Sequence, residues 1–320
     1  MNVQQSELQS STEFPKQNEV ISLKELWQML WLNKIMVISI TGIFIVASII
    51  ISLQLPDQYK SEVLLAPTTS NDQAGGGKLA NLVSRFGGLA SMAGINVGAS
   101  GVDKTALALE TLESRIFLIN FIKNHDLLIP LMATKKWDPD TNKLIIDDDI
   151  YNTSKKQWVR DVKPPLTPKP SDLEAYKVLK ERLNSSQDKK SGFVEVSFEF
   201  FSPQTAHDWL TWIIEDLNNT IRNDDISESK QSIDFLTKQI QTTTVTEMKQ
   251  VFFDLIQEQS KTMMLANVRD EYVLKTVDPA LTPEIKSKPK RVILVILGTI
   301  IGGVFSLLSM YLFGKKVGQK

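Results

Sequence analysis

The sequence predicts an α+β protein in which two transmembrane helices flank a folded domain that carries a long helix. Two apolar segments, residues 35–55 and 292–313, lie near the two ends of the chain. At about 1.5 Å per residue each reaches roughly 30 Å, the thickness of a bilayer's hydrocarbon core. The polar stretch between them, residues 56–291, contains both strand and helix periodicity. Because a chain that crosses twice leaves both ends on one side, we expect this domain on the other side.

The composition fits a water-soluble domain with two anchors. The net charge is −1, the mean hydropathy is −0.10 and 42% of the residues are hydrophobic, unlike a polytopic transporter or a disordered chain. With 37 acidic and 36 basic residues, no overall field favours a nucleic-acid partner. The absence of cysteine excludes disulfides, cysteine-ligated zinc and thiol catalysis.

The first segment is predicted to be a retained anchor with a cytoplasmic leader, residues 1–34. It starts too late for a cleaved signal peptide, and no small-residue cleavage site follows it. Residues 21–31 form an amphipathic pattern in which Trp27 and Trp31 suit the headgroup interface. Lysines before the first span and in the tail, residues 314–320, favour cytoplasmic termini. The basic run before the second span opposes this orientation, although the rule is weak for loops beyond about 60 residues.

Several elements of the central domain can be predicted locally. Residues 59–65 and 193–201 are strand patterns, and the second alternates apolar and polar residues. A helix is expected over 104–128, irregular structure over 130–170 and a last strand over 267–277. Residues 75–101 hold eight of the fifteen glycines, a density that favours a close-packed or mobile loop.

A long helix is predicted to begin after Ser202 and Pro203, which suit the cap and the first helical position. It continues to about Gln241, and a second helix over 247–266 completes a helical arm, about residues 203–266. Isoleucines seven residues apart indicate packing against a partner helix, which we interpret as an oligomer contact. The residues of this seam are Ile226, Ile233, Leu236 and Ile240.

The second span carries small residues at helical spacing. Residues four apart let helices approach closely in lipid, although glycine is also simply common in membrane helices. We favour a packing role, because the topology requires two spans or two protomers to pair. The candidate packing residues are Gly298, Gly302, Gly303 and Ser306.

The candidate phosphate-binding and calcium-binding motifs of the sequence are incomplete. Gly75–Gly77 precedes Lys78, but Asp72 and Leu79 occupy positions where a phosphate loop needs Gly and Ser or Thr. The acidic run 147–149 lacks the spaced ligands of a calcium loop.

The two histidines, His125 and His207, lie on separate helical patterns, and a solvated or packing role is favoured over a metal or triad role. Trp209 and Trp212 could stack on sugars, but their helical spacing favours the core. We therefore expect a protein that is not an enzyme and has no cofactor or metal.

The layout and several motifs resemble the Wzz-type polysaccharide co-polymerases, the O-antigen chain-length determinants. The resemblance includes residues 21–27 before the first span, 59–62 after it and 198–203 leading into the long helix. Its most specific part is a proline-rich stretch that continues into the glycine-containing second span. The motif residues there are Pro279, Pro283, Pro289, Lys290 and Arg291.

The resemblance implies a bacterial inner-membrane protein with a periplasmic α/β base near the membrane and a long helix rising from it. It also implies ring-like homo-oligomers that set how many repeat units a Wzy-type polymerase adds to a lipid-linked glycan. One alternative is a capsule or exopolysaccharide co-polymerase that works with a separate tyrosine kinase, because such proteins share the leader helix. A two-span periplasmic sensor is a further alternative, but the short termini leave no room for an output module.

Overall fold

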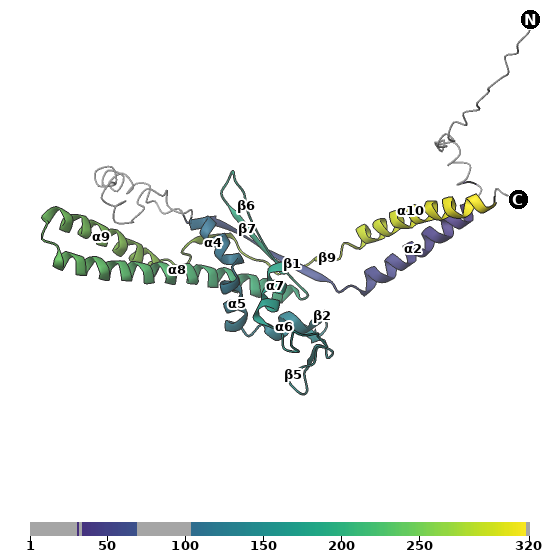
Figure 1. The fold of residues 1–320 in the computed structure, drawn as a ribbon, viewed down its shortest axis with the longest axis horizontal. Coiled ribbons are helices and arrows are strands. Elements are labelled where there is room, and N and C mark those ends of the chain that lie inside the picture. The colour runs from purple at the N-terminus through teal and green to yellow at the C-terminus, as the bar shows by residue number, and fades with distance from the viewer. Residues whose placement is uncertain (1–30, 32–33, 69–103, 318–320) are drawn as a thin grey trace, which may run out of the picture. The chain divides into compact units, whose positions relative to one another are not determined.

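The computed structural model describes residues 31, 34–68 and 104–317. The chain divides into two compact units, one made of Met1–Leu55 with Lys290–Lys320 and the other of Pro56–Pro289 (Figure 1). The expected leader helix, apart from Trp31, and the glycine-rich stretch 75–101 lie outside the described residues.

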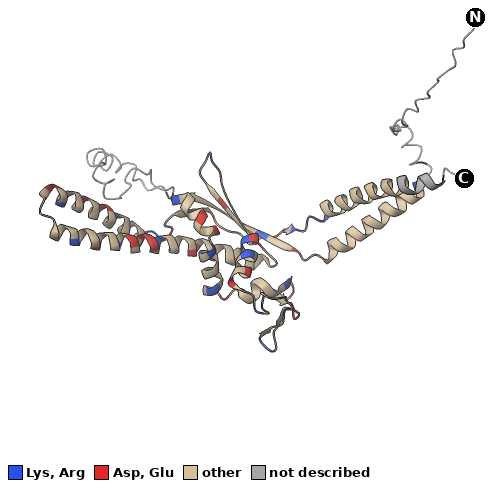
Figure 2. Cartoon of the chain, in the orientation of Figure 1, with Lys and Arg blue, Asp and Glu red and all other residues tan. Residues whose placement is uncertain are grey.

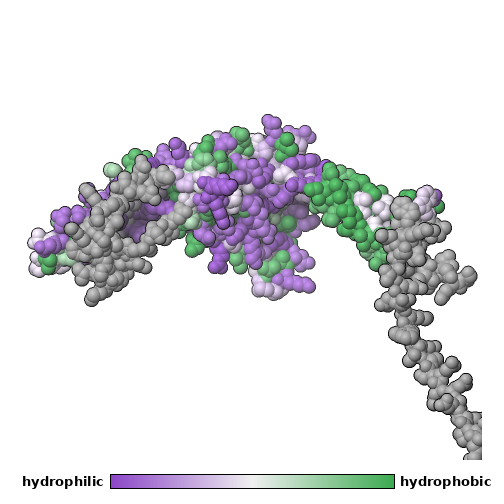
Figure 3. Space-filling model, turned by 90° about the horizontal axis from the view of Figure 1, so that it is seen from above, coloured by the Kyte–Doolittle hydropathy of each residue, from purple (hydrophilic) through white to green (hydrophobic). Residues whose placement is uncertain are grey.

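The first unit is an antiparallel pair of apolar helices, α2 (Lys34–Gln54) and α10 (Arg291–Val317). Both are long and apolar enough to cross a membrane. Only 6% and 17% of their apolar windows are buried, so these helices are not the core of a globular domain. Figure 2 draws the pair in tan over most of its length, and Figure 3 shows its surface as strongly hydrophobic.

The second unit is built on a five-stranded antiparallel sheet around β1 (Gln58–Pro67), which includes the strand predicted over 59–65. One edge of β1 pairs with β7 (Val194–Phe200), which pairs in turn with β6 (Leu183–Gln187). The other edge pairs with β8 (Leu274–Asp278) and β9 (Lys286–Lys288). The sheet therefore joins distant segments of the chain: Ser287 is hydrogen-bonded to Gln58, which lies 229 residues earlier.

Strand β7 confirms the alternating pattern, with Val194, Val196, Phe198 and Phe200 fully buried. The polar face of β7 is less exposed to solvent than the alternation predicts, since Ser197 and Glu199 on that face are also buried. Glu199 forms an ion pair with Lys288 of β9, which explains how a carboxylate is accommodated there.

The long helix α8 (Pro203–Thr242) has 40 residues and begins as predicted. The Ser202 hydroxyl accepts a hydrogen bond from the Thr205 amide, which caps the helix. The first half of α8 packs on the sheet, and the second half pairs with α9 (Thr246–Val268) in a helical hairpin (Figure 1). The predicted last strand, 267–277, is wrong in its first part. Helix α9 continues to Val268, residues 269–273 are not in a strand, and β8 begins only at Leu274.

The remaining elements lie between β1 and β6 in the sequence, and two expectations here are wrong. The predicted helix 104–128 is broken at Ser114, whose hydroxyl caps a new helix by accepting from the Phe117 amide. Residues 130–170 contain two short hairpins rather than irregular chain, with Asn142 and Lys156 at positive φ in the turns. The elements are α4 (Lys104–Glu113), α5 (Arg115–Asn124), α6 (Leu128–Ala133), β2 (Thr134–Asp138), β3 (Lys143–Ile146), β4 (Tyr151–Asn152), β5 (Gln157–Trp158) and α7 (Asp172–Arg182).

Candidate functional site

Two glycines of α10 form its contact with α2. A Cβ added at Gly298 would lie 2.6 Å from the Ser48 Cβ, and one at Gly302 would lie 2.7 Å from the Phe44 Cβ. Real Cβ atoms essentially never come this close, so only glycine allows this approach. Over one helical turn, the backbone of α10 therefore packs directly against side chains of α2.

The other two predicted packing residues differ from this pair. Ser306 is 1% exposed and its hydroxyl donates to the Gly303 carbonyl oxygen at 2.7 Å. A Cβ at Gly303 would have nothing within 4 Å. Of the three glycines, Gly298 and Gly302 therefore contact α2, whereas Gly303 lies on an open face of α10.

A buried asparagine lies at the root of the helical hairpin, which is the place where α8 passes the segment that returns from α9 to β8. Asn218 of α8 is 4% exposed, and its Oδ1 accepts from the amides of Val273 and Leu274 at 2.9 and 3.1 Å. Its Nδ2 donates to the Leu274 carbonyl oxygen at 3.0 Å. One side chain therefore satisfies three backbone groups of the segment that returns from α9 to β8.

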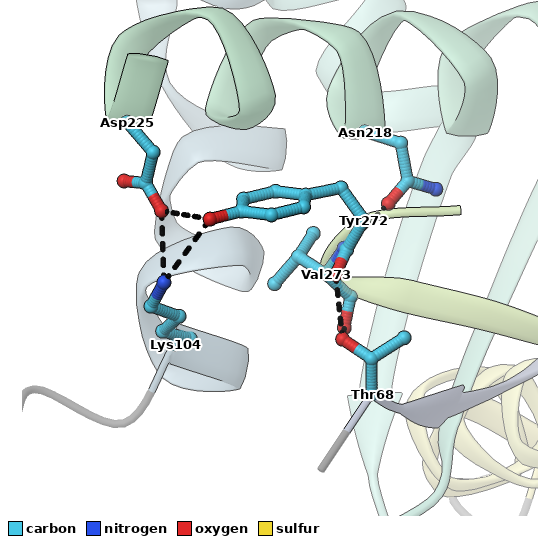
Figure 4. Close-up of polar contacts among 6 residues, drawn as sticks. All are labelled: Thr68, Lys104, Asn218, Asp225, Tyr272 and Val273. Atoms are coloured by element: carbon cyan, nitrogen blue, oxygen red, sulfur yellow. Dashed lines mark hydrogen bonds and ion pairs between the residues drawn. The ribbon is translucent and has the colours of Figure 1, made fainter. Parts of the chain in front are cut away.

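A polar cluster beside Asn218 joins four segments (Figure 4). The Tyr272 hydroxyl donates to Asp225 Oδ2 at 2.6 Å, and Lys104 Nζ lies 2.8 Å from the same oxygen. The Thr68 amide donates to the Val273 carbonyl oxygen at 3.0 Å, and the Thr68 hydroxyl donates to that of Tyr272 at 2.6 Å. The cluster fastens the end of β1 and the start of α4 to the hairpin root.

The electrostatics of this cluster favour its protonated groups. Burial raises the pKa of Tyr272, and the hydrogen bond to Asp225 adds to this rise. Burial alone lowers the pKa of Lys104, but the hydrogen bond and charge of Asp225 outweigh it, so this pKa lies above its ordinary value. Tyr272 and Lys104 therefore keep their protons at neutral pH, and each donates a hydrogen bond to Asp225.

A groove of about 540 Å³ lies along α8 next to β1 and β8. Val63, Leu210 and Ile214 supply apolar surface, while charged side chains such as Arg222 and Glu271 contribute to its lining. The groove is amphipathic, and it contains no residue set suited to nucleophilic chemistry among the described residues that line it.

The proline-rich motif before the second span is fastened along β1. Pro279 lines the groove, and the Ser61 hydroxyl donates to the Leu281 carbonyl oxygen at 2.9 Å. Farther on, the Ser287 hydroxyl donates to the Gln58 carbonyl oxygen at 3.2 Å. Pro283 and Pro289 are partly buried, Lys290 is exposed, and Arg291 begins α10.

The predicted seam residues lie along the arm. Ile226, Ile233, Leu236 and Ile240 are all half-buried on α8, whose neighbour within the chain is α9. Large apolar side chains nearby remain in the open, including Phe235 at 60% and Phe253 at 53% exposure. The arm therefore pairs internally and still presents apolar surface.

The two histidines, Trp209 and Trp212 all contact other side chains of the second unit. His125 stacks on Trp212 with ring centroids 4.9 Å apart, and its Nε2 lies 3.0 Å from Asp216. His207 contacts the neighbouring Asp208, and Trp209 is buried against Phe200. Within the described residues, no group of three or more His, Cys, Asp or Glu side chains could hold a metal ion.

Sequence reasoning missed Asn218, Asp225 and Tyr272. The available signal was a polar residue at position 218 on the apolar face of a helix, between Leu217 and Ile221. Such a residue needs a buried partner, but its position in the sequence does not identify that partner.

Together these elements define a mixed α/β protein with two candidate membrane spans and a helical hairpin arm. Residues 19–125 match the model of the Wzz family, described as chain length determinant protein, which confirms the resemblance over that stretch. The match includes the first span, β1 and the start of the α-helical region.

Two solved structures of polysaccharide co-polymerases are similar to this chain. One is a full-length bacterial polysaccharide co-polymerase, with 13% identity, coverage of 93% of this chain and 99% of that chain, and a TM-score of 0.38. The other is a fragment of WzzB from Salmonella Typhimurium, with 12% identity, coverage of 73% and 100%, and a TM-score of 0.26. None of the curated proteins compared with the chain matches it. The fold class rests on this chain's own helices and strands.

Proposed function

We propose that this chain is a non-catalytic polysaccharide co-polymerase that regulates the chain length of lipopolysaccharide O-antigen. The observation that carries the proposal is the Wzz match over residues 19–125, within a chain that has two candidate spans and a long helical arm. The chain would act together with a Wzy-type polymerase that extends a lipid-linked glycan. In this proposal the polymerase forms the glycosidic bonds and this chain regulates how many are formed.

We propose a bacterial inner-membrane topology with residues 1–34 and 314–320 in the cytoplasm and residues 56–291 in the periplasm. The natural absence of cysteine makes this testable without background labelling. A membrane-impermeant maleimide should label Ser227→Cys in intact spheroplasts and Ser11→Cys only after lysis. The reverse pattern would contradict the orientation.

We propose that regulation depends on homo-oligomers whose geometry arranges polymerases or growing chains. The exposed apolar side chains of the arm and the open face of Gly303 support protomer contacts. The seam residues Ile226, Ile233, Leu236 and Ile240 stiffen the arm and contribute to this contact surface.

Deletion of the gene tests the function, with surface polysaccharide separated on a gel. We expect the deletion strain to keep making polymer but to lose its modal length, and a plasmid copy to restore it. An unchanged length distribution would refute the proposal. A change confined to capsule or exopolysaccharide would favour the alternative co-polymerase that works with a kinase.

A further inference from the structure

A cavity of about 340 Å³ opens between α2 and α10, near the end of α2 and the beginning of α10. Its walls are apolar on both helices, and two polar side chains line it as well. The apolar wall residues are Ile49, Leu53, Val292, Val295 and Ile296, and the polar residues are Ser52 and Arg291. An apolar slot with a polar, positively charged part is unusual between two candidate membrane spans.

The Ser52 hydroxyl lacks a hydrogen-bond partner. Ser52 is 2% exposed, and its Oγ has no partner in the described part of the chain. Other hydroxyls of the pair are satisfied within their own helices: Ser48 donates to Ile45, Thr299 to Val295 and Ser306 to Gly303. Since an unsatisfied polar group in hydrocarbon is costly, the Ser52 hydroxyl indicates a missing binding partner.

The charge at this cavity favours an anion. Arg291 is the first residue of α10, so its guanidinium and the positive end of a 27-residue helix lie together. Lys290 adds a third positive feature immediately before the helix. A guanidinium is well suited to phosphate, because its planar N–H groups match the phosphate oxygens.

A second copy of the helix pair does not meet this requirement. Neither α2 nor α10 contains an aspartate or glutamate, so a neighbouring span cannot bring a carboxylate to the cavity. A soluble anion would satisfy the polar groups but leave the five apolar wall residues uncovered. An amphiphile with an anionic head and a hydrocarbon tail matches both chemistries.

We infer that this cavity binds the phosphate headgroup of an anionic phospholipid. The phosphate accepts hydrogen bonds from the Ser52 hydroxyl and the Arg291 guanidinium, and the hydrocarbon chain covers the five apolar wall residues. The inference depends on the proposed function only in requiring that α2 and α10 cross a membrane. A lipid bound here would contact both helices and so link the end of α2 to the beginning of α10.

Lipid retention by the purified full-length chain tests this site, with native mass spectrometry after exposure to phosphatidylglycerol or phosphatidylcholine. We expect phosphatidylglycerol to be retained more than phosphatidylcholine, because the choline cation compensates the phosphate charge and is repelled by the positive residues Lys290 and Arg291. Ser52→Ala and Arg291→Gln should each weaken the retention of phosphatidylglycerol about tenfold. Two matched controls, Ser306→Ala and Lys34→Gln, should bind as the wild type does, since both positions lie outside the cavity lining.

Thermal unfolding distinguishes a lipid ligand from a structural role of the hydroxyl. Without lipid, Ser52→Ala should unfold at a temperature no lower than the wild type, because its hydroxyl has no partner to lose. With phosphatidylglycerol, the wild type should gain more stability than the variant.

Three outcomes would overturn the inference. They are equal retention by Ser52→Ala and the wild type, equal retention of phosphatidylcholine, and displacement of the lipid by millimolar inorganic phosphate, which would indicate a small-anion site. These measurements use purified protein, whereas the chain-length proposal is judged in cells, so either can fail alone.

Discussion

The two antiparallel helix pairs of this chain are held together by different forces. The pair of α2 and α10 is apolar on its outer faces, and Gly298 and Gly302 bring its backbones close. The pair of α8 and α9 has a half-buried seam, outer faces on which charged residues alternate with exposed apolar ones (Figure 2), and a polar root around Asn218. In lipid the hydrophobic effect does not drive helices together, so close packing must do so, whereas in water an apolar seam suffices.

Chain connectivity sharpens this difference. Three residues, 243–245, join α8 to α9, so the hairpin closes locally at small entropic cost. The other pair is joined through the whole of Pro56–Pro289. Its helices therefore need a specific contact, which the two glycines provide.

The largest expected effect is at the root of the arm. Asn218→Leu leaves three backbone groups of Val273 and Leu274 without their partner, which should lower the free energy of unfolding by about 2–4 kcal/mol. The matched control is Asn219→Leu, an exposed neighbour, which should change it by under about 0.5 kcal/mol. Urea unfolding of the detergent-solubilised chain compares the two, and equal losses would show that the root is not held by Asn218.

The contact between the spans should be the next most sensitive feature. Gly302→Val forces α2 and α10 apart at Phe44 and should cost about 1–3 kcal/mol. Gly303→Val is the control, because its Cβ meets nothing within 4 Å and should have little effect on the pair. Melting temperatures in detergent report both variants, and a Gly303 variant that melts as low as the Gly302 variant would refute the assignment of faces.

A smaller effect is expected at the hydroxyl of Tyr272. Tyr272→Phe removes the hydrogen bond to Asp225 and should lower the free energy of unfolding by about 1 kcal/mol. Tyr176→Phe is the control, since the hydrogen bond of its hydroxyl to the Glu113 carbonyl oxygen is long, at 3.4 Å. If the two variants unfold alike in urea, the Tyr272 cluster does not stabilise the root.

The smallest expected effect is on the pH dependence of stability. The folded-state pKa values of Lys104 and Tyr272 both lie above their ordinary values, so their contribution is present below those ordinary values. It is lost as pH rises through the folded pKa values, so stability should fall above about pH 10. Asp225→Asn should flatten this fall in urea titrations. A fall of the same steepness in that variant would contradict the assignment.

Elements with strong local signals were predictable from the sequence. The alternation in β7, the Ser202–Pro203 start of α8 and the two apolar helices needed no information from distant residues. The break at Ser114 was missed because apolar periodicity continues on both sides of it. The short hairpins between 134 and 158 were missed because strands of two to five residues are too short to show alternation.

The candidate site was only partly predictable. The glycine set of α10 was visible, but the sequence could not show which members face α2, because a helix turns by about 100° per residue and the partner's direction is unknown. Asn218 acts on Leu274, which lies 56 residues farther along the chain. The groups that hold the arm depend on this long-range pairing, which a local pattern does not contain.

Polymerisation in liposomes with a purified Wzy-type polymerase, lipid-linked repeat units and this chain tests the proposed regulation directly. Adding the chain should concentrate the products around a modal length and leave the glycosidic linkage unchanged. The chain alone should make no polymer. A product distribution that is identical with and without the chain, or polymer formed by the chain alone, would contradict the claim that it is a non-catalytic regulator of length.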